Sequence, residues 1–126
     1  MSTIINTSNA PAPIGPYNQA VLAGNMLFVS GQIALDAQTG ELVLTDINTE
    51  TTKVLENIKA ILNEAGLDFS HIIKTSIFLK DMGTFAQVNE IYGSYFTGNY
   101  PARETVQVAA LPKNVNVEIS VIAYKG

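Results

Sequence analysis

The chain has 126 residues, close to the commonest size of a protein domain, and we expect residues 1–126 to form a single domain. Only 14% of the residues are charged, the net charge is −4 and no run of Lys or Arg occurs, so the sequence argues against nucleic-acid binding. The lack of cysteine excludes disulfides, thiolate nucleophiles and thiolate metal ligands.

The low charge also bears on assembly. An ordinary soluble domain has about 25% charged residues, so this chain has few charges with which to coat the surface of a monomer. We therefore expect an oligomer with apolar interfaces.

Residues 1–18 lack the basic start and apolar segment of a signal peptide, and no run of about 18 apolar residues occurs. We expect a cytoplasmic protein that does not bind membranes.

The first third of the chain predicts a loop followed by a hairpin. Residues 10–16 contain three prolines, which exclude a helix and indicate an ordered loop or a polyproline II stretch. Two apolar segments, 19–23 and 26–33, flank the pair Gly24-Asn25, which suits a primed turn with positive φ. Gly31 marks a place where the backbone comes close to another group.

A helix is predicted after the turn-rich residues 36–40, with Asp46 as its N-cap and Gly66 just beyond its end. A β-rich segment, 71–79, then completes a β-α-β unit, whose crossover is right-handed if its strands are parallel. The helix prediction depends on residues that recur at helical spacing, namely Ile47, Thr51, Val54, Leu55, Ile58, Ile61, Leu62 and Ala65.

A second helix is predicted over residues 84–97, ending at Gly98, and two strands, 104–110 and 115–124, close the chain. This order of elements predicts an α+β fold with two helices on one face of a mixed sheet. No third helix is available for the other face, so subunits are expected to associate through it. The stripe of the second helix consists of Phe85, Val88, Tyr92, Tyr95 and Phe96.

Glu118 is the first polar residue that stands out. It lies in a strand that places Val115, Val117, Ile119, Val121 and Ala123 on one face and leaves Asn116, Glu118, Ser120 and Ile122 on the other. Pattern alone favours an exposed glutamate on a half-solvated sheet. If that face is an interface, the carboxylate is desolvated, which raises its pKa and suits a general base.

Arg103 and Asn89 are two further candidates. Arg103 stands at the start of a strand, where it forms either a weak surface ion pair with Glu104 or a planar cationic fork for a small carboxylate. Asn89 lies at the rim of the buried helix stripe, where a satisfied helix-edge amide is the alternative.

Other chemistries have less support. His71 is the only histidine, so any Ser-His-Asp arrangement would have to use it. Without a second histidine or a cysteine, a typical zinc site is excluded. Neither GxGxxG nor GxxxxGK[ST] occurs. We expect no metal and no cofactor.

Five blocks of the sequence, in order, resemble those of one known family, with a helix between them that carries Asp81-Met82, Phe85-Ala86, Val88-Asn89, Tyr92 and Phe96. The chain is similar in this way, over essentially its whole length, to the RidA family, also called YjgF. The blocks are Ala12-Pro13-Ile14-Gly15-Pro16-Tyr17-Asn18-Gln19-Ala20, Val29-Ser30-Gly31-Gln32-Ile33, Pro101-Ala102-Arg103, Leu111-Pro112 and Val117-Glu118-Ile119.

The resemblance implies a chorismate-mutase-like fold with a mixed six-stranded sheet, two helices on one face, and a homotrimer with clefts between subunits. It implies hydrolysis of 2-imino or 2-enamino acids, such as 2-iminobutanoate and 2-iminopropanoate released by pyridoxal-phosphate enzymes, to 2-oxo acids and ammonia. Arg103 matches the family's carboxylate-binding position and Glu118 its water-handling position. The positions that match cleft-lining residues are Tyr17, Ser30, Gly31 and Asn89.

Two residues depart from the family pattern. Thr105 occupies a place that is often cysteine, and as a neighbour of the cleft it is expected to affect substrate preference. Glu104 stands where a small residue is common, and strand alternation places it on the face opposite Arg103 and outside the pocket.

Two other functions stay open. The same cleft in a non-catalytic regulatory module would bind a 2-oxo acid or another small carboxylate. Ribonuclease activity or translation inhibition, which has been attributed to similar proteins, is disfavoured by the acidic charge and by the lack of a second histidine.

Overall fold

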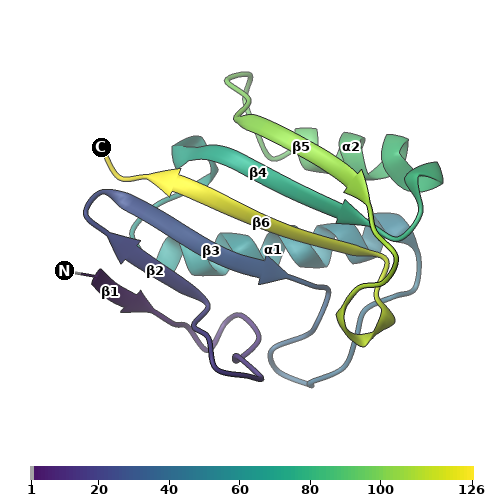
Figure 1. Ribbon diagram of the computed structural model, residues 1–126, viewed down its shortest axis with the longest axis horizontal. Coiled ribbons are helices and arrows are strands. Elements are labelled where there is room, and N and C mark those ends of the chain that lie inside the picture. Colours follow the sequence, from purple (N-terminus) through teal and green to yellow (C-terminus); the bar gives the residue numbers. More distant parts are fainter. Residues whose placement is uncertain (1) are drawn as a thin grey trace.

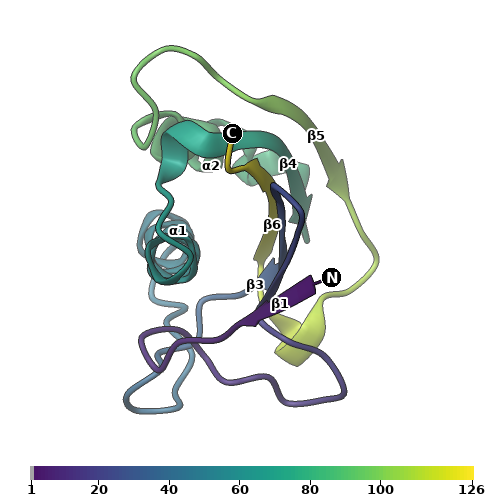
Figure 2. The ribbon, with the colours of Figure 1, turned by 90° about the vertical axis from the view of Figure 1, so that its left-hand side faces the viewer.

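Both helices cover the same face of one six-stranded sheet, as Figures 1 and 2 show for this computed structural model, which describes residues 2–126. The order of strands across the sheet is β1-β2-β3-β6-β4-β5, and every neighbouring pair is antiparallel except β4 and β5. This confirms the predicted α+β fold with a mixed sheet. The elements are β1 Ser2–Ile5, β2 Ala20–Ala23, β3 Met26–Gln32, α1 Ile47–Glu64, β4 Ile72–Leu79, α2 Phe85–Gly93, β5 Ala102–Gln107 and β6 Val117–Tyr124.

Helix α1 begins and ends where the sequence predicts. The side chain of Asp46 accepts a 2.7 Å bond from the amide of Thr49, and Gly66 has the positive φ (+77°) that allows the chain to leave the helix. The apolar residues at helical spacing form the centre of the core, and five of them, Val54, Leu55, Ile58, Ile61 and Leu62, have no exposed surface. Neither helix in residues 2–126 is long and apolar enough to cross a membrane.

Helix α2 is shorter than predicted. It ends at Gly93 rather than near Thr97, because the amides of Tyr95 and Phe96 bond three residues back instead of four. Gly and Ser at positions 93 and 94 are weak helix formers. The chain leaves the helix so that Tyr95 and Phe96 can pack on the ring of Phe69, at centroid distances of 4.9 and 5.6 Å.

The structure supplies the strand order, which the sequence pattern leaves open. The sequence pattern misses β1, a four-residue strand that pairs with β2. The two strands of the β-α-β unit, β3 and β4, run parallel to each other, and β6 lies between them. The two C-terminal strands are not neighbours either, because β4 separates β5 from β6. β5 also runs from Ala102 to Gln107 rather than over 104–110.

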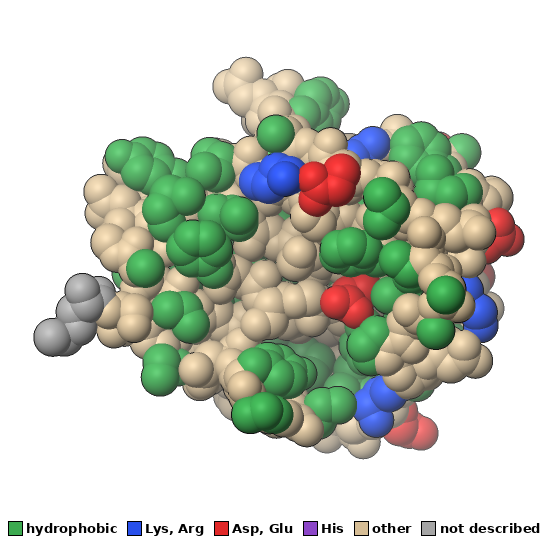
Figure 3. All heavy atoms as spheres, viewed as in Figure 1, with side chains coloured by type: hydrophobic (Ala, Val, Ile, Leu, Met, Phe, Trp, Pro, Cys, Tyr) green, Lys and Arg blue, Asp and Glu red, His purple; other side chains and the backbone are tan. Residues whose placement is uncertain are grey.

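The sheet face that turns away from the helices is called the outer face here, and no helix covers it (Figure 2). Alternation along β6 places Glu118, Ser120 and Ile122 on this face while their neighbours fill the core. Figure 3 views the outer face and shows hydrophobic side chains gathered on it with few charges among them. Large apolar residues that remain exposed in this single chain include Ile4, Phe28, Val106 and Tyr124.

Candidate functional site

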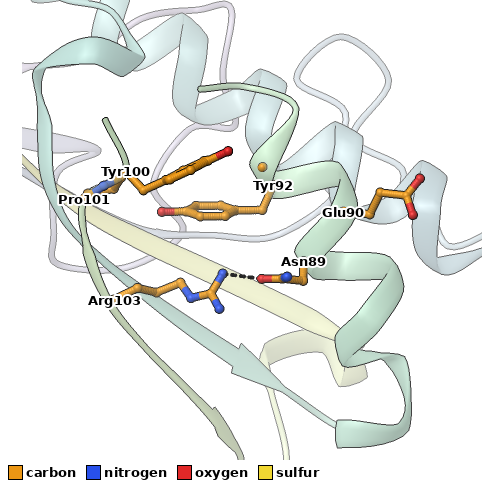
Figure 4. A pocket seen from close by; sticks show the side chains of 7 residues that line it. Asn89, Glu90, Tyr92, Tyr100, Pro101 and Arg103 are labelled. Carbon is orange, nitrogen blue, oxygen red and sulfur yellow. Dashed lines mark hydrogen bonds between the residues drawn. The ribbon is translucent and has the colours of Figure 1, made fainter. Parts of the chain in front are cut away.

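Arg103 lies on the edge strand β5, and helix α2 holds its guanidinium group. Nη1 donates a 2.7 Å hydrogen bond to Oδ1 of Asn89 (Figure 4). The Cζ atom lies 5.6 Å from the ring centre of Phe85 and 5.2 Å from that of Tyr92. Aromatic rings attract a cation placed over their faces. Because Asn89 is its only acceptor within residues 2–126, the fork keeps further N–H donors for a ligand.

A pocket of about 650 Å³ opens beside this guanidinium group. Tyr92, Tyr100 and Pro101 form its walls, and Glu90 points away from the guanidinium group in Figure 4. Burial raises the pKa of Tyr92, whose hydroxyl donates a 2.9 Å bond to the Thr75 hydroxyl, so this wall stays an uncharged phenol at neutral pH. The pocket therefore combines one cation with aromatic surfaces, which suits a small anion.

Thr105 follows Arg103 on the same face of β5. Its Oγ1 atom is buried and has no hydrogen-bond partner within residues 2–126. A buried hydroxyl without a partner is uncommon in native proteins and costs free energy. A ligand that reached this position would supply the missing partner. Asn89, Arg103 and Thr105 are called the Arg103 half-site below.

Glu118 lies half-buried on the outer face, directly against Gly31. A Cβ atom at position 31 would lie 2.8 Å from the Glu118 carboxyl carbon and still closer to Oε2. The sequence prediction that the backbone at Gly31 comes close to another group is therefore confirmed, and that group is the carboxylate. β3 and β6 lose their regular register between Val29 and Gln32, which places Gly31 in an irregularity of the strand. Burial raises the pKa of Glu118.

Tyr17 lies near Gly31 in a second, smaller hollow, and Ser30 precedes Gly31 on β3. Tyr17 and Gly31 both line this hollow, together with Gln19, which directly precedes β2. The hydroxyl of Ser30 donates a 2.6 Å bond to the Asn18 carbonyl, so it ties the loop that carries Tyr17 to β3. Tyr17, Gly31 and Glu118 are called the Glu118 half-site below.

The two half-sites of one chain lie on opposite faces of the sheet. Arg103 pairs in register with Thr75, which is fully buried beneath α2. Glu118 pairs in register with Phe78 on the outer face. Paired residues on neighbouring strands share a face. The chain thus brings together Asn89, Arg103 and Thr105, and separately Tyr17, Gly31 and Glu118, but not the two sets.

The remaining candidates have structural contacts. Glu104 does not pair with Arg103; it faces the outer side, where it binds Lys74 at 2.8 Å and accepts from the Ser76 hydroxyl. His71 closes a capping box with Asp68, whose amide donates to Nδ1 at 3.1 Å. Within residues 2–126, three or more His, Asp or Glu side chains nowhere converge in a way that could hold a metal ion.

Sequence reasoning missed the aromatic platform under Arg103. Phe85 and Tyr92 carry helical spacing, which is the signal of a core stripe and says nothing of a cation above it. Tyr100 was not singled out either, because it lies in a loop without a motif of its own. The register of Arg103 with Thr75 was the missing information.

Comparison with known proteins gives the chain its family. The family model described as Endoribonuclease L-PSP matches residues 7–125. A RutC family protein of Pyrococcus horikoshii is 54% identical over 125 residues, or 99% of each chain. The 2-iminobutanoate/2-iminopropanoate deaminase of Rattus norvegicus is 49% identical over 123 residues, which cover 98% of this chain and 90% of that protein.

A solved structure agrees with these sequence matches. The crystal structure of a protein of the conserved Rid family from Yersinia pestis has a TM-score of 0.96 at 48% identity, and the match covers 98% of this chain and 99% of that one. The five sequence blocks therefore identified the family correctly: this chain belongs to the RidA family, whose model is described as Endoribonuclease L-PSP.

Proposed function

We propose that the protein hydrolyses 2-imino and 2-enamino acids, such as 2-iminobutanoate and 2-iminopropanoate, to 2-oxo acids and ammonia. The name of the rat relative, at 49% identity, supports this reaction class. The observation that carries the proposal is the Arg103 fork, which Asn89 and two aromatic rings hold beside an open pocket. A planar, permanently charged fork of this kind suits a substrate carboxylate.

The carboxylate bound at Arg103 fixes the orientation of the substrate, and Glu118 supplies the base. Water adds to the carbon of the protonated C=N bond as Glu118 takes one of the water protons, which gives a neutral carbinolamine. Glu118 then returns that proton to the amino nitrogen, and the C–N bond breaks as the carbinol hydroxyl passes its proton to the departing ammonia, so that a 2-oxo acid and ammonium leave. A positioned acid/base contributes about 10² to 10⁴ in rate. Burial raises the pKa of Glu118, which brings it closer to neutral pH and favours both transfers.

One active site needs both half-sites, and one chain holds them on opposite faces of its sheet. We therefore infer that Arg103 of one copy meets Glu118 of another across a subunit interface in a homotrimer. The uncovered apolar residues of the outer face, among them Phe28 and Val106, support burial of this face in an assembly. Thr105, with its buried and unpartnered hydroxyl, would face the substrate from the Arg103 side.

The test is ammonia release when threonine dehydratase generates 2-iminobutanoate in the assay. We expect wild type to accelerate release and Arg103→Ala to abolish the acceleration. Lys59→Ala serves as the matched control because it removes an exposed cation from α1, far along the chain from both half-sites. An Arg103→Ala protein with wild-type rates and unchanged assembly would refute the role of Arg103.

The description of the family model also raises ribonuclease activity as a second candidate. The net charge of −4 and the single histidine, which closes a capping box, argue against it. RNA cleavage by purified wild type that disappears in Arg103→Ala would favour it. The third candidate, a non-catalytic binder of 2-oxo acids, would show calorimetric binding of 2-oxobutanoate without any acceleration of ammonia release.

A further inference from the structure

A buried carboxylate lies on the opposite side of β6 from Glu118, and the mechanism above does not use it. Glu50, in the first turn of α1, has no exposed surface. Its Oε2 accepts bonds from the amides of Asn116 at 2.8 Å and Val117 at 3.2 Å, and its Oε1 accepts from Nδ2 of Asn116 at 2.7 Å. It forms no ion pair within residues 2–126. Burying an acidic side chain is costly, so three donated bonds at one place call for an explanation.

These three bonds hold the point at which β6 begins. Val117 is the first residue of the strand, and Glu118 follows it directly. The Asn116 carbonyl is held from the other side by the amide of Lys80, at 3.0 Å. The backbone that carries Glu118 is therefore fixed by α1 and by the end of β4 together.

The loop that leads into β6 needs such an anchor. Lys113 and Asn114 adopt positive φ values of 54° and 56°, a left-handed conformation that costs residues other than glycine free energy. Without an anchor at residues 116 and 117, this loop can relax and the start of β6 can move. Such a movement carries Glu118 with it, whereas the Arg103 half-site lies on β5 and α2.

We propose that Glu50 is a positioning residue for the deamination: through Asn116 and Val117 it fixes the strand that carries Glu118 and so sets the place of the base. This inference rests on the proposed function. Misplacement of a reacting group by about 1 Å costs on the order of 10² in rate. Removal of Glu50 should therefore lower kcat and leave KM, which depends on the Arg103 half-site, nearly unchanged.

The test compares Glu50→Leu with Glu50→Gln and Thr51→Val. Leu removes all three bonds, and we expect kcat to fall about 10- to 100-fold with KM within about threefold. Gln keeps an oxygen that accepts from both backbone amides. Its NH2 group can donate to the side-chain oxygen of Asn116 once the Asn116 amide group flips by 180°, so at least a third of the wild-type kcat should return. Thr51 is equally buried but bonds only within α1, to the Ile47 carbonyl, so Thr51→Val should keep the wild-type kcat.

Hydrogen exchange provides a readout that does not depend on turnover. The amides of Asn116 and Val117 should exchange faster in Glu50→Leu than in wild type, and they should be unchanged in Thr51→Val. If Glu50→Leu fails to fold, Asn116→Ala is tested instead. This substitution removes the hydrogen bond from Asn116 Nδ2 to Glu50, so kcat should fall several-fold at constant KM.

A folded Glu50→Leu protein with wild-type kcat would overturn the inference. So would a rise in KM that matches the fall in kcat, a Gln variant as impaired as the Leu variant, or, where Asn116→Ala must decide, an unchanged kcat. The wild type separates the two proposals. If wild type releases no ammonia, the proposed function fails and this inference with it; if wild type is active and Glu50→Leu equally so, this inference alone fails.

Discussion

Gly31→Ala tests the contact between β3 and the Glu118 carboxylate. The added Cβ would lie 2.8 Å from the Glu118 carboxyl carbon and closer still to Oε2, so the carboxylate must move. A rotation of the Glu118 side chain by about 30° away from its rotamer costs on the order of 1 kcal/mol. The displaced carboxylate then no longer directs the attacking water at the reacting carbon. Since a positioned base contributes about 10² to 10⁴ in rate, we predict a fall in kcat on the order of 10².

The same substitution should hardly change stability. Gly31 is exposed and does not adopt a positive φ, so alanine fits its backbone. The loss of unfolded-state freedom on replacing glycine contributes about 0.4–1 kcal/mol of stability, which offsets the cost of moving Glu118. The net change in the free energy of unfolding is then at most about 1 kcal/mol, which shifts the midpoint of thermal unfolding by only a few degrees.

Ammonia release from 2-iminobutanoate gives kcat, and thermal unfolding gives the midpoint. The control is the same substitution in a Glu118→Ala background, compared by thermal unfolding because that background is inactive. Alanine at position 31 meets no carboxylate there, so the midpoint should rise by the full unfolded-state contribution. Wild-type kcat in Gly31→Ala would refute the reasoning. So would an equal change of the unfolding midpoint in both backgrounds, because the effect of the substitution would then not pass through Glu118.

Three further predictions concern the side chains of Glu118 and Asn89. Because burial raises the pKa of Glu118, the acid limb of the pH profile of kcat should lie above the ordinary Glu pKa of about 4.3. Glu118→Asp provides a shorter acid that is better hydrated, so it should move this acid limb to lower pH. The raised value means that the folded chain binds the Glu118 proton more tightly than the unfolded chain; this contribution to stability is complete below about pH 4.3 and is lost as the pH rises through the folded value. Glu118→Gln should therefore raise the unfolding midpoint at pH 7 but not at pH 4, and an equal shift at both would contradict this sign. Asn89→Ala removes the 2.7 Å bond to Arg103 and should raise KM for the imino acid roughly 3- to 10-fold, with a smaller effect on kcat, in steady-state measurements.

Local signals in the sequence predict local structure well. Asp46 and Gly66 mark the ends of α1 because a cap and a positive φ act within one turn. The alternation of β6 predicts which of its residues are buried, because a strand repeats every second residue. β1 and the early end of α2 are not predicted, because distant partners decide them: pairing with β2 in one case and packing on Phe69 in the other.

The candidate site shows the same division. Arg103 and Glu118 are found through the family resemblance, since spacing alone leaves both as surface charges. That they lie on opposite faces depends on the register of β5 and β6 with β4, and no local pattern carries that register. The contact of Arg103 with the rings of Phe85 and Tyr92 also depends on the register of β5 with β4.

The central claim is that each active site takes Arg103 from one copy and Glu118 from another. Mixing two inactive variants, Arg103→Ala and Glu118→Ala, tests it directly, with native mass spectrometry to verify that subunits have exchanged. After random exchange of equal amounts, about a quarter of the interfaces would join an intact Arg103 to an intact Glu118. We predict recovery of about one quarter of the wild-type rate of ammonia release. A mixture that has exchanged subunits and stays inactive would contradict the account.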